Sequence, residues 1–197
     1  TSTTEGFFVG TNGASFKTSN GGANWTSFST GIGNKTGVHF VNTTQGWVVG
    51  ANNSIYTTSN GGISWTSQVT VTTTSFQNVY FYNESQGYAF TGSQFYNTSN
   101  GGSTWSLSPN STPSGAIYFK DGVNGWVVGA SGTIYTTTNG GSSWISQTSG
   151  TTNGLNGVYF INNNKGWAVG GNGTILMTNN GGTTWTTQTS GSSQYLR

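Results

Sequence analysis

Thr58-Ser59-Asn60-Gly61-Gly62-Ile63-Ser64-Trp65 is the stretch that decides the fold, because its pattern recurs along the whole chain of 197 residues. The octet Thr-x-Asn-Gly-Gly-x-x-Trp occurs five times, at intervals of 39 to 41 residues. A second series, Gly-aromatic-x-x, recurs with nearly the same period and places its rings at Phe7, Trp47, Tyr88, Trp126 and Trp167. Two series in one register indicate five copies of a unit of about 40 residues.

Each unit contains four short strand signals and no helical periodicity. In the second unit the first three strands are expected at residues 38–41, 46–50 and 54–58, and the fourth begins at Trp65. Gly- and Asn-rich turns join them, which predicts a small antiparallel meander whose two faces must be covered by neighbouring units. The sequence therefore predicts one all-β domain over residues 1–197, a five-bladed β-propeller of four-stranded antiparallel blades. The repeat units are about 6–45, 46–86, 87–124, 125–165 and 166–197.

The octet is expected at the turn between the third and fourth strands of each unit. Gly61 and Gly62 can adopt positive φ at little steric cost, and Asn60 can hydrogen-bond to nearby main chain. Trp65 is expected to fold over its own turn and to be buried there. The residues given this structural role are Asn20, Gly22, Trp25, Asn60, Gly62, Trp65, Asn100, Gly102, Trp105, Asn139, Gly141, Trp144, Asn180, Gly182 and Trp185.

The octets resemble the Asp-box, or BNR repeat, of sialidases, sortilin-type receptors and related propellers. The longer unit from Gly166 to Trp185 is similar to repeats of the photosystem II stability/assembly-factor family, whose relatives also occur in secreted bacterial proteins. The resemblance covers essentially the whole chain and implies Asp-box-like turns between strands three and four. Asn stands in place of the family's Asp in every octet, which keeps the turn hydrogen bonds and removes the charge. A cation-binding role for these turns is therefore not expected.

The composition excludes several classes of function. Charged residues make up 4% of the chain, against a usual fraction of about 25%, and there is one His and no Cys. We therefore expect no metal site, no cofactor and no disulfide. A net charge of +2 from scattered residues gives no basic stripe for nucleic acid, and no apolar run is long enough for membrane insertion. The hydroxyl- and amide-rich composition is associated with secreted proteins, so an extracellular, cell-surface location is expected.

Catalysis is not expected either. The resemblance to sialidases would require an arginine triad, and the chain has one arginine, Arg197. The three carboxylates, Glu5, Glu84 and Asp121, lie at related positions in different repeats, which spreads them around a propeller instead of pairing them. His39 lies where other units carry Tyr, so it is interpreted as a packing residue.

Two functions remain open. One is a non-catalytic structural scaffold or an adhesive, interaction module of a surface or secreted protein. The alternative is a carbohydrate-binding, lectin-like propeller, because apolar sugar faces stack on aromatic rings and sugar hydroxyls pair with amides and hydroxyls. The partner is another protein in the first case and a surface glycan in the second. A photosystem assembly role is less expected, since that family's activity is associated with a basic arginine patch. The octet face is committed to packing, so the predicted ligand residues lie on the opposite face: Asn12, Asn52, Ser131, Asn172, Lys35, Thr73 and Asn153.

The closure of the ring has two interpretations. Residues 1–6 align with the segment that follows a first strand, so the opening blade lacks its own first strand. The segment 194–197 can pair beside residues 7–9 and close the ring as a clasp. A competing alignment places Leu196 with Leu155, which makes this chain part of a longer array or assembly. We favour the clasp, because it removes exposed strand edges.

Overall fold

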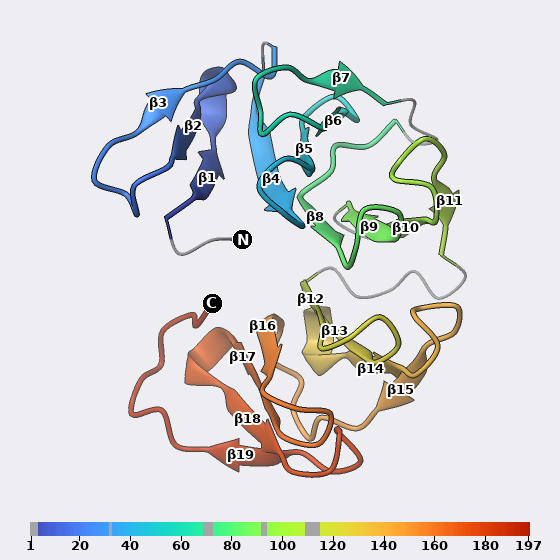
Figure 1. The fold of residues 1–197 in the computed structure, drawn as a ribbon. Helices are drawn as coiled ribbons and strands as arrows, with labels where there is room; N and C mark the ends of the chain where they lie inside the picture. Colours follow the sequence, from blue (N-terminus) through green and yellow to red (C-terminus); the bar gives the residue numbers. More distant parts are fainter. Residues whose placement is uncertain (1–3, 32, 69–72, 92–93, 109–114) are drawn as a thin grey trace. The chain divides into compact units, whose positions relative to one another are not determined.

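The computed structural model describes residues 4–31, 33–68, 73–91, 94–108 and 115–197, and they form strands, turns and three short 3-10 turns. The chain divides into two compact units, residues 1–108 and 109–197. The first unit contains three antiparallel sheets and the second contains two (Figure 1). Each sheet keeps its strands in chain order, so each is a meander. The predicted all-β, antiparallel organisation is confirmed.

Five sheets follow one another along the chain, and the first three belong to the first unit. The first sheet contains β1 (Gly6–Val9), β2 (Ser15–Thr18) and β3 (Thr26–Ser27), with the 3-10 turn η1 (Thr11–Gly13). The second contains β4 (Lys35–Phe40), β5 (Gly46–Gly50), β6 (Ile55–Thr58) and β7 (Thr66–Ser67). The third contains β8 (Asn78–Phe81), β9 (Gly87–Phe90), β10 (Phe95–Thr98) and β11 (Ser106–Leu107).

The second unit repeats the same meander twice. The fourth sheet contains β12 (Ala116–Phe119), β13 (Gly125–Val128), β14 (Ile134–Thr137) and β15 (Ile145–Gln147), with η2 (Ala130–Gly132). The fifth contains β16 (Leu155–Phe160), β17 (Gly166–Gly170), β18 (Ile175–Thr178) and β19 (Thr186–Gln188), with η3 (Gly171–Gly173). The outermost strands span only two or three residues in all five sheets.

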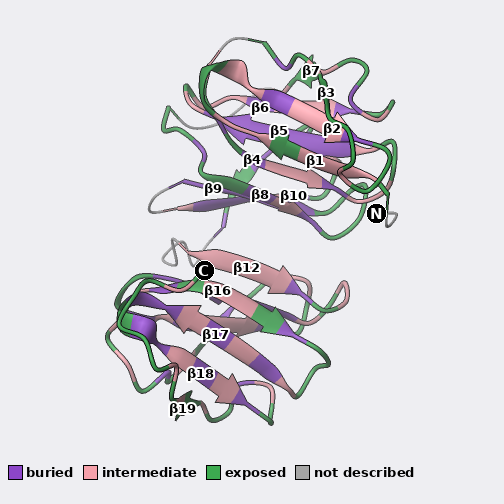
Figure 2. Ribbon diagram, turned by 90° about the vertical axis from the view of Figure 1, so that its left-hand side faces the viewer, coloured by how far each residue is buried: buried purple, intermediate pink, exposed green. Residues whose placement is uncertain are grey.

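The Gly-aromatic strands form the centre of the packing. β5, β9 and β13 are buried along their whole length (Figure 2), which explains why they read as continuous apolar runs. Their first glycine is required by a close approach. A Cβ atom on Gly46 would come within 2.5 Å of the Phe40 ring, so this ring lies directly on the glycine. Phe81 on Gly87, Phe119 on Gly125 and Phe160 on Gly166 repeat this contact.

The same phenylalanines join consecutive sheets. Trp47 of the second sheet stacks on Phe81 of the third at a ring-centroid distance of 3.4 Å, and its indole N–H donates to the Gly101 carbonyl at 2.9 Å. Trp126 stacks on Phe160 at 3.5 Å and donates to the Gly181 carbonyl. The first and second sheets are joined by the stacked pair Phe7–Phe40, at 3.6 Å. Each Gly-aromatic ring in these three pairs therefore contacts the next sheet along the chain.

The octet tryptophans contact these phenylalanines from within their own sheet. Trp105 meets Phe81 edge-on at 5.8 Å and is 3% exposed, and Trp144 contacts Phe119 at 5.9 Å. Trp65 and Trp185 make the equivalent contacts with Phe40 and Phe160 and are half-buried. The expectation that every octet Trp is buried is wrong for Trp25, which is 43% exposed. The described part of the first sheet has no first strand, so no first-strand phenylalanine lies beside Trp25.

The octet turns share one hydrogen-bond pattern. Thr58 Oγ1 accepts from the Gly62 N–H at 3.0 Å, and its hydroxyl donates to Asn60 Oδ1 at 2.9 Å. Asn60 Oδ1 also accepts from the Ser64 N–H, and its Nδ2 donates to Ser64 Oγ at 2.8 Å. Gly62 has a φ of 81°, in the region that favours glycine. The pattern recurs in the other octets, except that the first has Asn24 in place of the hydroxyl residue.

Candidate functional site

The meander separates two faces within each unit. The octet turns lie beside the turns between the first and second strands, as the bond from the Gly61 N–H to the Thr44 carbonyl shows, at 2.8 Å. We call this side the octet face. At the other strand ends, the turns between the second and third strands meet the crossovers between sheets, for example through the bond from the Phe76 N–H to the Gly50 carbonyl, at 3.2 Å. We call this side the crossover face.

Four of the predicted ligand residues occupy equivalent positions on the crossover face. They are the residues at the centre of the turn between the second and third strands, with φ between 53° and 56°. Asn tolerates this left-handed conformation better than most residues, which gives three of these positions a conformational reason for their side chain, whereas the fourth is Ser131. The four are Asn12, Asn52, Ser131 and Asn172.

Crossover side chains bond to these turns. Asn34 Oδ1 accepts from the Asn12 N–H at 3.0 Å, and Ser75 Oγ accepts from the Asn52 N–H at 3.2 Å. In the second unit, Asn172 Nδ2 donates to Asn153 Oδ1 at 3.1 Å. The polar groups of this face therefore hold the turns and the crossovers together.

A pocket of about 600 Å³ in the second unit brings two predicted residues together, Ser131 and Asn153. The remaining lining residues are Ser, Thr, Gly and Gln from the turn after β13 and from 146–152, and no aromatic ring is among the residues that line it. We call it the crossover pocket. Thr73 is exposed in the crossover before β8. That any of these residues contacts a ligand stays a prediction.

Lys35 does not fit the predicted ligand set. It is the first residue of β4, its N–H donates to the Gly10 carbonyl at 2.9 Å, and only 4% of its surface is exposed. The Lys35 Nζ lies 5.1 Å from the centre of the Tyr56 ring, and burial lowers the pKa of this ammonium. The sequence suggested an exposed crossover residue, but the strand begins here and carries the side chain inward.

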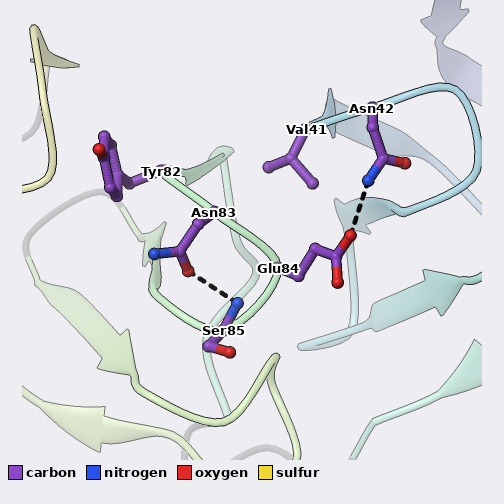
Figure 3. Close-up of a pocket in the computed structure, with 6 residues that line it drawn as sticks. All are labelled: Val41, Asn42, Tyr82, Asn83, Glu84 and Ser85. Carbon is purple, nitrogen blue, oxygen red and sulfur yellow. Dashed lines mark hydrogen bonds between the residues drawn. The ribbon is translucent and has the colours of Figure 1, made fainter.

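A groove on the octet face was missed by the sequence reasoning. It lies between the second and third sheets, encloses about 490 Å³ and is lined by Val41, Asn42, Tyr82, Asn83, Glu84 and Ser85. We call it the turn groove. Glu84 reaches across it, and Asn42 Nδ2 donates to Glu84 Oε1 at 2.8 Å (Figure 3). Asn83 caps its own turn by accepting from the Ser85 N–H at 2.8 Å. Tyr82 is 39% exposed.

The second unit has a groove at the equivalent place, between the fourth and fifth sheets. It encloses about 430 Å³ and is lined by Lys120, Asp121 and residues 162–164. Asp121 Oδ1 accepts from the Asn124 N–H at 2.6 Å and from the Val123 N–H at 2.9 Å. These bonds, the first above all, lower the pKa of the Asp121 carboxyl. Asp121 is therefore an ionised turn cap, and a side-chain hydrogen bond with Asn163 also links it to the neighbouring sheet, much as Asn42 links Glu84 to the second sheet.

His39 takes part in packing between two sheets. Its ring lies 4.8 Å from that of Tyr80, and the pair Tyr118–Tyr159 in the second unit repeats the contact at 5.0 Å. Burial lowers the pKa of His39 to about 4, so the imidazole is neutral near pH 7. Within the described ranges, no three His, Asp or Glu side chains cluster in a way that could hold a metal ion. None of the helical turns in those ranges is long and apolar enough to cross a membrane.

The repeated sheets, their stacked aromatic contacts and the octet turns resemble those of BNR-type β-propeller proteins. Residues 110–187 match the family model described as photosynthesis system II assembly factor YCF48, and the chain resembles that protein. Among solved structures, YCF48 from Cyanidioschyzon merolae is 21% identical with a TM-score of 0.74, over 93% of this chain and 69% of that one. No curated protein sequence matches this chain.

Two further structures extend the comparison. YCF48 bound to a D1 peptide is 17% identical with a TM-score of 0.53, over 94% of this chain and 77% of that one. A GH74 enzyme from Niastella koreensis is 21% identical with a TM-score of 0.76, but the chain spans 34% of its length. At these identities the solved structures show the fold alone. The expected extracellular location is wrong, because the matching family model describes a photosystem assembly factor and not a surface protein.

Proposed function

We propose that this protein is a non-catalytic protein-interaction module, a single five-bladed propeller with Asp-box-type turns that binds polypeptide through its turn groove. The groove carries the proposal, because it combines an exposed ring, a carboxylate and two side-chain amides between two sheets. A D1 peptide occupies the solved YCF48 complex, which gives a precedent for peptide binding on this fold.

The chemistry of the described residues supports a binding role over catalysis. Asp121 is held in the ionised form by its own turn, and the neutral His39 packs against the tilted ring of Tyr80. Glycoside hydrolysis commonly uses a raised-pKa carboxylic acid facing a second carboxylate. A depressed pKa is the opposite of what the general acid needs, so Asp121 is unsuited to that role.

The turn groove offers complementary groups for an extended peptide. Tyr82 can pack against an apolar or cationic side chain, and the second oxygen of Glu84 can accept from a peptide N–H or an ammonium. Asn42 orients the carboxylate from the neighbouring sheet. A peptide with a basic or amide-rich centre flanked by apolar residues fits these groups best.

The experiment is selection from a displayed random-peptide library, run beside a glycan array with the same protein. We expect enrichment of peptides whose binding is lost in Tyr82→Ala and weakened in Glu84→Gln. The control is Thr148→Ala, which changes an exposed residue of the crossover pocket and should leave binding unchanged. Absence of any enriched peptide, or loss of binding only in the Thr148 variant, contradicts the proposal.

The carbohydrate-binding alternative has its own prediction. Sugar faces commonly stack on aromatic rings, and the residues that line the crossover pocket supply hydroxyls and amides without a ring. A saturable signal on the glycan array that is insensitive to Tyr82→Ala would favour this alternative.

A further inference from the structure

The turn of every octet requires an Asn followed by a Gly. The Gly has a φ between 64° and 70° in all five octets, the left-handed region that favours glycine. A Cβ atom would also crowd the chain, since on Gly61 it would lie 2.9 Å from the Thr43 carbonyl oxygen. The Asn makes the bonds that hold the turn together, as Asn60 does with Thr58 and Ser64. The five pairs begin at Asn20, Asn60, Asn100, Asn139 and Asn180.

Asn-Gly is the dipeptide most prone to spontaneous deamidation, because glycine has no side chain to shield its nitrogen. This nitrogen attacks Cγ of the Asn and forms a new C–N bond, and the side-chain nitrogen leaves as ammonia with the proton of the glycine N–H. Water then opens the cyclic imide at either carbonyl and leaves Asp or isoaspartate. All five octet Asn residues are exposed, so water reaches them.

The folded octet opposes this reaction at both reacting groups. The glycine N–H donates to the carbonyl two residues before the Gly-aromatic strand, at 2.7 to 2.9 Å in all five octets. The Asn side chain is held as well: Asn60 Oδ1 accepts from the Thr58 hydroxyl and the Ser64 N–H, and its Nδ2 donates to Ser64 Oγ. Closing the imide ring brings Cγ onto the Gly61 nitrogen, a movement that these bonds resist.

The first octet lacks one of these bonds. In the other four octets the residue four positions after the Asn carries a hydroxyl, and the Asn Nδ2 donates to it at 2.8 to 2.9 Å. In the first octet this residue is Asn24, and Asn20 Nδ2 donates to no group among the described residues. Asn20 Oδ1 still accepts from the Thr18 hydroxyl and from the Asn24 N–H, both at 2.9 Å. Asn20 therefore differs from its four counterparts by one hydrogen bond, at the nitrogen that leaves.

We propose that Asn20 is a site of spontaneous deamidation and the first of the five octets to react. The reaction proceeds from the opened turn, and the loss of one ordinary hydrogen bond raises the population of the opened turn by about fivefold. An Asp product keeps an oxygen for the turn bonds, whereas isoaspartate adds a methylene to the main chain and disrupts the turn. Each event adds one carboxylate, so the first lowers the formal net charge by one, from +2 to +1.

The test is incubation of the parent protein at mildly alkaline pH in heavy-oxygen water, with and without urea. The label enters only products formed during the incubation. Chymotrypsin cleaves after aromatic residues and separates the octets into peptides such as 17–25 and 57–65, in which mass spectrometry locates the label. We expect Asn20 to deamidate about fivefold faster than Asn60 in the folded protein. In urea the two rates should be similar, because both lie in the sequence Ser-Asn-Gly-Gly.

Two reciprocal substitutions separate the missing hydroxyl from other features of the first octet, such as the exposed Trp25. Asn24→Ser should slow Asn20 to the rate of Asn60, and Ser64→Asn should raise the rate of Asn60 to that of Asn20. Circular dichroism verifies that both variants keep the fold. Equal rates at Asn20 and Asn60 in the folded parent, or a rate at Asn20 that Asn24→Ser leaves unchanged, would overturn the inference. An Asn20 that stays intact in the folded protein while it reacts in urea would overturn it as well.

Discussion

Trp25 and Trp105 are the same residue of the same octet in two different surroundings, and replacing each by Ala measures the value of the first-strand phenylalanine. Both lie in the unit formed by residues 1–108, so both report on the unfolding of the same body. Trp105 is 3% exposed and contacts the Phe81 ring at 5.8 Å. Trp25 is 43% exposed and contacts Phe8 at 5.0 Å.

The two substitutions are expected to lower the free energy of unfolding by different amounts, and the difference is larger than the buried areas alone suggest. Truncation of a buried aromatic side chain costs about 3–5 kcal/mol, which includes the cavity left behind. We expect this range for Trp105→Ala, since the edge contact with Phe81 is lost as well. Water can fill the space beside Trp25, so the cavity contribution disappears, and we expect about 1–2 kcal/mol for Trp25→Ala.

Urea unfolding followed by far-UV circular dichroism measures both costs, because tryptophan fluorescence is altered by the substitutions themselves. The linear extrapolation gives each free energy of unfolding, and an unchanged slope confirms that the variants unfold as the parent does. If the two costs agree within about 1 kcal/mol, the first-strand phenylalanine contributes little. The account of Trp25 would then be refuted.

Three further predictions concern single side chains. Trp47→Phe should cost about 1 kcal/mol more than Trp105→Phe in the same urea assay, because the Trp47 indole donates to Gly101 while Trp105 Nε1 is buried without a partner among the described residues. The folded-state pKa of His39 is lowered to about 4, so its stabilising effect is complete above the unfolded pKa near 6.5 and is lost as pH falls towards 4. The free energy of unfolding should fall by up to about 3 kcal/mol over this pH range, and His39→Tyr should make it depend less on pH. Urea unfolding at several pH values measures this, and an equal pH dependence in parent and variant would contradict the prediction. Asn60→Asp should change the free energy of unfolding by less than about 1 kcal/mol, because a carboxylate oxygen can accept the same bonds from the Thr58 hydroxyl and the Ser64 N–H. Asn60→Ala removes both bonds and should cost more. Equal losses in the two variants would show that these bonds contribute little.

The repeat predicted the strands well, because each was read in several copies. The expected strand at 46–50 is β5 with the same bounds, and the expected strand at 54–58 differs from β6 by one residue. The fourth strand was expected to begin at Trp65, and its pairing begins one residue later, at Thr66. The fourth strands lie at the outer edge of each sheet, where ladder pairing ends soon after the octet turn.

The central role of the phenylalanines could have been found from the sequence. Phe40, Phe81, Phe119 and Phe160 recur at the repeat period, as the octet Trp does. The octet is longer and more distinctive, so it drew attention first. Yet a single phenylalanine, such as Phe81, contacts both the Gly-aromatic ring of the preceding sheet and the octet Trp of its own sheet. Spacing shows that positions are equivalent, but it does not show which residue lies between two others.

The binding surfaces could not be predicted in the same way. The turn groove forms because Asn42 and Glu84, in turns of adjacent sheets, approach to 2.8 Å, and nothing in either turn by itself indicates the other. Lys35 shows the opposite error: its polarity suggested exposure, but its place at the start of β4 buries it. Contacts between repeats depend on how the sheets pack, and the period alone does not report this.

The first sheet shows how strongly the surroundings of one repeat position depend on the strand beside it. Gly6, Thr18, Gly22 and Trp25 are the residue types that bury a phenylalanine elsewhere in the chain. Among the described residues no first strand pairs with β1, and the same set lines a cavity of about 240 Å³ beside a Trp25 that is 43% exposed. The burial of an octet Trp therefore depends on the phenylalanine of the first strand as well as on its own turn.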